Sequence, residues 1–283
     1  MPELPEVETV KRQLKKVVLG CRINQIEVLE KKQFFGSPEA IIGQKIKEIS
    51  RRAKVLIIGL DSLSLLIHLK MTGQIIYLSK KKKPIGLGHP LPFSPNQLPN
   101  KATRVIIQLD DGSRIFFNDL RKFGWLKILT KSEAKREFSI LGPEPLRKDF
   151  KINQLKDVLA KTSREIKIVL MDQTKIAGIG NIYANEILFK VGLNPRRQAN
   201  LLSNRETEKL YQVIREVLLE AIKHGGTSAA DKAYLRPDAS LGRYQNFLKV
   251  YQREGKECFN CSKKIKKIIQ AGRGTFFCSK CQE

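Results

Sequence analysis

Acidic side chains, cysteines outside one cluster and long apolar runs are all scarce in this chain of 283 residues. The longest apolar run, residues 55–69, is broken by Asp61 and Ser62, so we expect no membrane-spanning helix. The N-terminus is acidic and has no apolar signal region, which argues against secretion. One isolated cysteine and four C-terminal ones do not resemble a disulfide framework, so we expect an intracellular, cytoplasmic protein.

The shortage of acidic residues leaves a large positive charge. Lys and Arg number 53 against 28 Asp and Glu, which gives a formal charge of +25. An excess of this size indicates a polyanionic partner, with nucleic acid ahead of an anionic membrane. Apolar residues make up 41% of the chain, enough for a packed core, and the length suits one large domain or two ordinary ones.

The first nine residues, MPELPEVET, combine two prolines with three glutamates. Methionine before a small penultimate residue is usually trimmed, and trimming turns Pro2 into a free secondary amine. An α-amino group has a reference pKa of about 8, so part of it is unprotonated at neutral pH. A secondary amine that attacks a sugar carbon forms a charged iminium, the electron sink of Schiff-base catalysis. Glu3 is then a candidate proton donor.

The same stretch also suits an ordinary helix start. Pro5 is tolerated in the first turn, and Glu6 and Glu8 suit the positive end of the helix dipole. Both interpretations hold together if the helix fixes the amine in place. Apolar residues recur at helical spacing and a glycine follows as a stop: Val7, Val10, Leu14, Val17 and Gly20.

Short β patterns rich in Ile, Leu and Val come next. Closely spaced strands without long helices between them predict an antiparallel sandwich, which we place in a domain over residues 1–131. Asp110-Asp111-Gly112 is typical of a hairpin turn, and residues 80–102, rich in lysine and proline, predict a long surface loop. The expected strands lie near residues 22–29, 45–49, 54–60, 63–69, 74–78, 103–109, 114–117 and 125–129.

Composition changes after about residue 131. A linker over residues 132–150 contains Gly142-Pro143-Glu144-Pro145 and leads into a helical domain over residues 151–254. Its helical patterns lie near residues 152–160, 164–172, 182–191 and 203–224, and residues 227–254 are expected to be loop.

The last of these helical patterns is the clearest. Ser203 and Glu206 predict a capping box, and Gly225-Gly226 ends the helix. The stripe expected to be buried is Leu210, Val213, Ile214, Val217, Leu218 and Ala221.

Four cysteines near the C-terminus follow the spacing C-x2-C-x16-C-x2-C: Cys258, Cys261, Cys278 and Cys281. This spacing predicts one tetrahedral, structural zinc ion in a ribbon over residues 255–283, whereas two disulfides are disfavoured in a reducing compartment. Such a site is closed, so the metal has no catalytic role. The insert carries five cations, Arg273 among them, which favours a ribbon laid against phosphates. Cys21 is left over and is expected to be a small buried hydrophobe.

Several of these motifs resemble the bacterial formamidopyrimidine-DNA glycosylases, which remove oxidised purines from DNA. The resemblance extends from Pro2 to Cys281 and includes the N-terminal PELPEVET, the GIGN at residues 178–181 and the AGRGT around Arg273. It implies an α+β fold: an antiparallel β-sandwich with flanking helices, a helix–two-turn–helix domain and a zinc ribbon. It also implies that Pro2 is the nucleophile and Glu3 an acid.

The resemblance implies roles for three polar residues. Lys54 matches a lysine near the scissile phosphate, although by itself it is a basic start of a strand. Asn181 matches an asparagine that contacts the DNA backbone, although a GxGN turn alone is an ordinary helix connection. Arg273 matches the ribbon arginine that clamps a phosphate and assists elimination.

Met71, Arg121 and Phe123 match residues that fill the hole left by an everted nucleotide. Side chains that unstack a base step are a known physical device. The alternative from the residues alone is that Met71 lies in the core, that Arg121 forms a hairpin salt bridge and that Phe123 is a packed ring.

The resemblance therefore implies a bifunctional DNA glycosylase and AP lyase that acts as a monomer on duplex DNA containing oxidised bases. An endonuclease VIII-like enzyme for oxidised pyrimidines and a non-catalytic zinc-ribbon DNA binder are the alternatives. Two segments depart from the family: residues 101–104 lack the histidines that many relatives carry, and residues 227–245, which in relatives cover the extruded base, have an unusual sequence.

Overall fold

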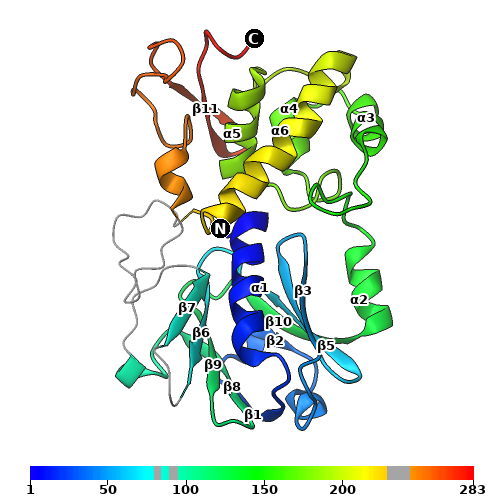
Figure 1. Cartoon of the computed structure of the whole chain (residues 1–283), viewed down its shortest axis with the longest axis vertical. Coiled ribbons are helices and arrows are strands. Elements are labelled where there is room, and N and C mark those ends of the chain that lie inside the picture. The colour runs from blue at the N-terminus through cyan, green and yellow to red at the C-terminus, as the bar shows by residue number, and fades with distance from the viewer. Residues whose placement is uncertain (80–83, 89–94, 228–242) are drawn as a thin grey trace. The chain divides into compact units, whose positions relative to one another are not determined.

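The computed structural model describes residues 1–79, 84–88, 95–227 and 243–283 (Figure 1). Their contacts divide the chain into two compact units, Met1–Ser139 with Gly225–Gln245 and Ile140–His224 with Asn246–Glu283. The domain boundaries expected from composition stay predictions. Within these described ranges, the helices are all too short or too polar to cross a membrane.

The N-terminal helix forms as its sequence predicts. Helix α1 spans Leu4–Val18, with Pro5 in its first turn, Glu6 near its positive end and Lys15 and Lys16 in its last turn. The buried stripe of the helix ends on Val18, which is fully buried and follows Leu14 at helical spacing. Val17, expected in this stripe, is only partly buried against the core.

The first unit holds two five-stranded sheets, which confirms the sandwich (Figure 1). One has the order β1-β8-β9-β6-β7 and the other β2-β10-β5-β4-β3. All pairings are antiparallel except β2 with β10. The strands are β1 (Ile23–Val28), β2 (Phe34–Phe35), β3 (Glu48–Arg52), β4 (Val55–Gly59), β5 (Leu63–His68), β6 (Gly73–Leu78), β7 (Ile85–Gly88), β8 (Thr103–Leu109), β9 (Arg114–Asp119) and β10 (Trp125–Thr130).

The core of this unit lies between the two sheets. Burial alternates along β8, so that Val105 and Ile107 point inward. They join Phe117 of the same sheet and Leu56 and Leu65 of the other in one cluster. Each fully buried side chain of this kind stabilises the fold by roughly 1.5–3 kcal/mol. Helix α1 contributes to the cluster and contacts β3 and β4 of one sheet and β7 of the other.

One sequence prediction is wrong in part. Residues 80–102 are not all loop, because β7 lies within them, pairs with β6 and buries Leu87. Its alternating glycines resemble loop composition, but Gly88 needs its freedom: its φ is +93°, and a Cβ there would lie 2.8 Å from the carbonyl oxygen of Gly73. Helix α2 (Lys131–Phe138) occupies the start of the expected linker, with Thr130 as its N-cap.

The second unit is helical apart from its ribbon. The capping box of α6 is present: Glu206 N donates to Ser203 Oγ at 3.3 Å, and Ser203 N donates to Glu206 Oε2 at 2.8 Å. All six residues of the predicted stripe of α6 are buried. A short strand pair, β11 and β12, forms the ribbon. The elements are α3 (Ile152–Ala160), α4 (Ile166–Met171), α5 (Asn181–Val191), α6 (Asn204–Lys223), β11 (Lys266–Gln270) and β12 (Arg273–Phe277).

Candidate functional site

Pro2 and Glu3 lie buried at the start of α1, and Glu3 is only 2% exposed. Glu6 holds this start from two sides. Its Oε2 accepts a hydrogen bond from Glu3 N at 2.8 Å, and its Oε1 accepts from Thr227 N at 2.8 Å. A Cβ on Gly226 would lie 2.7 Å from Glu6 Oε1, so the close approach requires glycine. The helix start therefore fixes the position of the N-terminal residues.

Lys54 is buried at 5% exposure in the turn between β3 and β4. Arg51 ties this turn to α1 through two contacts. Its Nε lies 3.2 Å from Glu8 Oε2 of the helix, and its guanidinium donates a hydrogen bond to Ala53 O of the turn at 2.7 Å. Ala53 has a φ of +50°, an uncommon conformation for a residue with a Cβ. The helix that begins beside Pro2 and the turn that carries Lys54 are thus linked by one ion pair.

Glu8 stays ionised for a physical reason. Burial alone would raise the pKa of its carboxyl, but hydrogen bonds from Lys11 and Arg12 and the charge of Arg51 outweigh burial and hold that pKa below its usual range. The Lys11 Nζ lies 2.7 Å from Glu8 Oε1 and the Arg12 Nε lies 2.9 Å from it.

Met71, Arg121 and Phe123 are exposed rather than packed. Met71 is 37% exposed, so the interpretation of Met71 as a core residue is wrong, and the Phe123 ring is 53% exposed. The Arg121 guanidinium lies over the Phe123 ring, 4.8 Å from its centroid. Thr72, next to Met71, accepts a hydrogen bond from Arg121 N at 3.0 Å, so the structure brings the three side chains to adjoining turns.

Asn181 and Arg273 belong to the second unit, and Asn181 contacts the backbone of the residue that follows Arg273. The Asn181 side chain donates to Gly274 O at 3.1 Å, immediately after Arg273. Lys167 Nζ donates to the same oxygen at 3.1 Å and to Thr275 Oγ1 at 2.7 Å. Lys167 was not predicted, although a lone lysine in the apolar IKIVLM helix is a signal; it is 1% exposed.

Two further side chains of α5 hold the ribbon and the segment that precedes it. Asn185 Oδ1 accepts from Phe276 N at 2.7 Å. Glu186, 4% exposed, accepts three backbone N–H donors from residues 249–251 at 2.8 to 3.0 Å. Buried polar groups of this kind fix a single arrangement, because an unmade hydrogen bond here is costly.

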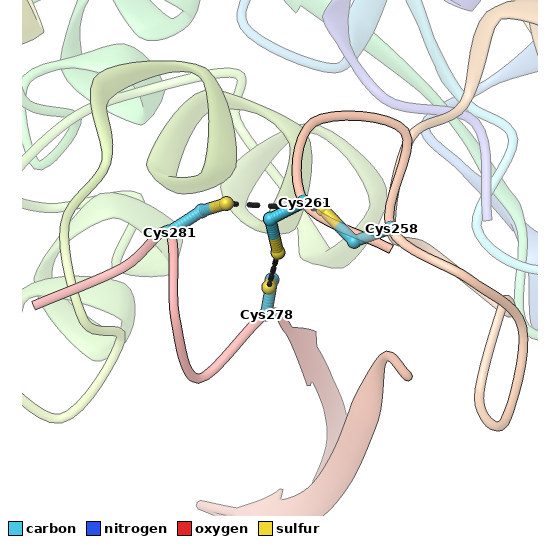
Figure 2. Close-up of side chains that lie close together, drawn as sticks. All are labelled: Cys258, Cys261, Cys278 and Cys281. Carbon is cyan, nitrogen blue, oxygen red and sulfur yellow. Dashed lines mark hydrogen bonds between the residues drawn. The ribbon is translucent and has the colours of Figure 1, made fainter. Parts of the chain in front are cut away.

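Figure 2 shows the four cysteines of the ribbon on two turns, with their sulfur atoms turned toward one another. The ligand atoms all lie within 4.8 Å of one another, and no two cysteines are bonded. The Cys258 and Cys281 Sγ atoms are 3.9 Å apart, and those of Cys261 and Cys278 are 3.4 Å apart. Tetrahedral zinc with Zn–S bonds of about 2.3 Å separates its sulfurs by about 3.8 Å. The residues fit zinc, and this is the site of one structural zinc ion.

The surroundings of the four thiols affect their ionisation unevenly. Burial opposes the thiolate at Cys278, but backbone N–H groups of Lys280 and Cys281 and the neighbouring thiols lower its pKa to about 7. Burial, followed by the neighbouring thiols, raises the pKa of Cys281 to about 12. A bound dication favours all four thiolates, so metal binding releases protons.

A second group of possible metal ligands carries less weight. Cys21, Asp110 and Asp111 lie close together, but the acidic pair is exposed and its oxygens accept bonds from Arg22 and Ser113. Cys21 is only partly buried, though it packs against the core as expected of a small hydrophobe.

The structure describes one of the two segments that depart from the family more fully than the other. Residues 227–245 lie largely outside the described part of the chain. At residues 101–104, Arg104 Nε donates to Asp119 O at 2.9 Å, so an arginine supports the strand end here.

Comparisons with known proteins cover the chain in three parts. Residues 1–126 match the formamidopyrimidine-DNA glycosylase N-terminal domain, residues 141–233 the formamidopyrimidine-DNA glycosylase H2TH domain, and residues 255–283 the zinc finger found in FPG and IleRS. A formamidopyrimidine-DNA glycosylase of Listeria monocytogenes is 35% identical over 290 residues, which cover 100% of both chains.

Solved structures agree with the sequence comparisons. The Lactococcus lactis FPG mutant G226P, in complex with Fapy-dG-containing DNA, is 33% identical with a TM-score of 0.87 and 100% coverage of both chains. The L. lactis Fpg in complex with abasic-site DNA is 33% identical with a TM-score of 0.86 and 99% coverage of both chains.

Proposed function

The chain belongs to the formamidopyrimidine-DNA glycosylase family, and from this premise we propose that it excises formamidopyrimidines and 8-oxoguanine from duplex DNA with Pro2 as the nucleophile. It is a base-excision repair enzyme, a DNA glycosylase with AP lyase activity. The position of Pro2 carries this assignment. Pro2 lies beside the buried Glu3 at the start of α1, where Glu6 accepts a hydrogen bond from Glu3 N.

Removal of Met1 frees the Pro2 nitrogen as a secondary amine. Its lone pair attacks C1′ of the damaged nucleotide, the glycosidic bond breaks and the base leaves with a proton that Glu3 supplies. Ring opening of the sugar gives an iminium, which acidifies the C2′ proton. Loss of that proton expels the 3′ phosphate, and a second elimination expels the 5′ phosphate, which leaves a one-nucleotide gap.

Residues of both units support these steps. Lys54 lies near the scissile phosphate and assists elimination, while Arg273 and Asn181 hold backbone phosphate. Met71, Arg121 and Phe123 fill the hole left by the everted nucleotide, whose unstacking costs a few kcal/mol. The metal is structural and takes no part in bond breaking.

Borohydride trapping tests the nucleophile. Reduction during turnover should leave protein covalently attached to lesion DNA, with the adduct on the N-terminal proline by mass spectrometry. An uncleavable N-terminal extension should abolish trapping and incision but keep DNA affinity, because an amide nitrogen cannot attack. Lys54→Ala should still trap, with slower strand cleavage. An adduct on Lys54, or full activity with the blocked N-terminus, contradicts the proposal.

The second candidate activity is excision of oxidised pyrimidines, as in the endonuclease VIII class. The PELPEV start favours oxidised purines over that class's PEGPEI-like start. A panel of duplexes with single lesions separates the two, because the specificity is a ratio of kcat/KM values. The same family membership makes a non-catalytic zinc-ribbon binder untenable.

We further propose that the enzyme acts as a monomer in the bacterial cytoplasm, associated with the nucleoid through DNA. The charge of +25 suits duplex DNA. Sedimentation of the protein on a short lesion duplex checks the stoichiometry, with one protein per duplex expected.

A further inference from the structure

Asp119 is a fully buried carboxylate between two exposed turns. It ends β9, is 0% exposed and pairs across the sheet with Gly73 of β6. Met71 comes two residues before Gly73, and Phe123 comes four residues after Asp119. The buried carboxylate therefore lies at the base of both turns.

Four donors converge on this carboxylate, two on each oxygen. Its Oδ1 accepts from Thr72 Oγ1 and from Arg121 N, the latter at 3.3 Å. Its Oδ2 accepts from Gly124 N at 2.7 Å and from Gln33 Nε2 at 3.0 Å. A carboxylate offers about four lone-pair positions, so these four donors satisfy it.

Gln33 closes the base of the second turn. Its Nε2 also donates to Gly124 O at 2.7 Å, so it holds the residue that ends this turn together with Asp119. The packing leaves no room at Gly124: a Cβ there would lie 2.7 Å from the Phe117 ring and 3.0 Å from Asp119 Oδ2.

Thr72 joins the two turns. Its hydroxyl donates to Asp119 and accepts from Arg121 N at 3.0 Å, so one side chain bridges the turn of Met71 and the turn of Arg121. Both turns contain a non-glycine residue in the left-handed region, Lys70 with φ +49° and Lys122 with φ +56°. Such conformations persist only where the surroundings fix them.

We propose that Asp119 is a positioning residue that holds Met71, Arg121 and Phe123 in one preorganised unit through Thr72 and Gln33. The proposal rests on the assignment of those three residues under Proposed function. Side chains that must enter a base stack act best when their backbone is already ordered, because the cost of ordering is then not added to the cost of unstacking. No direct contact of Asp119 with DNA is involved.

Thr72→Val is the sharpest variant, because it is nearly isosteric and leaves the carboxylate with its three other donors. The substrate is a formamidopyrimidine-containing duplex with 2-aminopurine next to the lesion, whose fluorescence rises when the step unstacks. In single-turnover experiments we expect the unstacking rate and excision to fall roughly tenfold, the effect of losing one hydrogen bond. Borohydride trapping on a preformed abasic site should change by less than about twofold, because no base has to leave the stack there.

Three matched variants complete the test. Thr72→Ser keeps the hydroxyl and should restore unstacking. Asp119→Asn replaces one acceptor oxygen by a donor and should lower unstacking further. Ser113→Ala removes a buried hydroxyl, bonded to Asp111, just before the other end of β9, and should behave as wild type.

The outcomes separate this proposal from the one on which it rests. Wild-type unstacking in Thr72→Val, with Phe123→Ala impaired, overturns the role of Asp119 and leaves the wedge intact. Wild-type unstacking in Phe123→Ala overturns the wedge assignment itself. An equal loss in Ser113→Ala, or an equal loss of abasic-site trapping in Thr72→Val, also overturns the positioning role, because the effect is then general destabilisation of the sheet.

Discussion

Arg121 and Arg273 each lie at a tight turn, and each turn is supported by a polar acceptor, a side-chain carboxylate in one and a backbone carbonyl in the other. The turn of Arg121 is gathered around a buried acceptor, the Asp119 carboxylate, which collects N–H and O–H donors. The turn of Arg273 is gathered around a backbone acceptor, Gly274 O, on which Lys167 and Asn181 converge as donors. Hydrogen bonds from polar groups support both turns, and the ribbon carries a metal site in addition.

Loss of the metal should have the largest effect, and that effect should be confined to the ribbon. Cys278→Ser should lower zinc content from about one ion per chain and unfold the ribbon locally, because structural zinc contributes about 10 kcal/mol or more to folding. DNA affinity should fall, while the β-sandwich unit keeps its fold. Metal analysis and DNA titration check this. Full zinc occupancy with wild-type affinity removes the assignment of the metal site.

Loss of the buried lysine should have a smaller effect on the same turn. Lys167→Met leaves Gly274 O and Thr275 Oγ1 without this donor, which should cost roughly 1–3 kcal/mol in the free energy of unfolding. Zinc content should stay at the wild-type level and DNA affinity should fall.

Denaturant unfolding and DNA titration measure both effects of Lys167→Met. Lys209→Met, at an exposed position of α6, is the matched control. An equal loss in the control means that lysine charge, and not support of the turn, accounts for the change.

The last effect concerns the sandwich side and appears only below about pH 6.5. Burial, and after it the charges of Lys70 and Lys54, lowers the pKa of His68 from 6.5 to about 3. Below pH 6.5 His68 of the unfolded chain becomes protonated, whereas His68 of the folded protein stays neutral until the pH approaches 3. The stability that neutral His68 contributes is therefore fully present above pH 6.5 and is lost as the pH falls toward 3, with a slope approaching about 1.4 kcal/mol per pH unit.

His68→Asn should flatten that slope. The asparagine oxygen can accept the hydrogen bond that Lys70 N donates to His68 Nδ1 at 3.0 Å, so stability at pH 7.5 should change little. Denaturant titrations between pH 4 and 7.5 compare the two proteins. An unchanged slope in the variant means that another group titrates in this window.

Local patterns in the sequence predict much of this structure. The cysteine spacing identifies the metal ligands, and the helical period identifies α1 and the buried stripe of α6. These signals lie within one element or one short motif. The short strand β7 was missed because its glycines resemble loop composition.

The support of the site could not be predicted in the same way. The partners of Asp119 lie 47 and 86 residues away in sequence, at Thr72 and Gln33. Lys167 reaches Gly274 across 107 residues. No local period reports such pairs, since only the fold brings them together. Composition likewise could not predict that Gly225–Gln245 belongs to the first unit.

The place of the only tryptophan gives the protein a built-in optical reporter. Trp125 follows Gly124, the residue that closes the turn of Phe123, and its ring lies 5.5 Å from that of His68 and 5.1 Å from the Lys127 ammonium. Indole emission responds to nearby charge and polarity, so movement of that turn against DNA should change it. Stopped-flow fluorescence of the unlabelled enzyme can then follow base eversion in real time, with ordinary DNA and no dye.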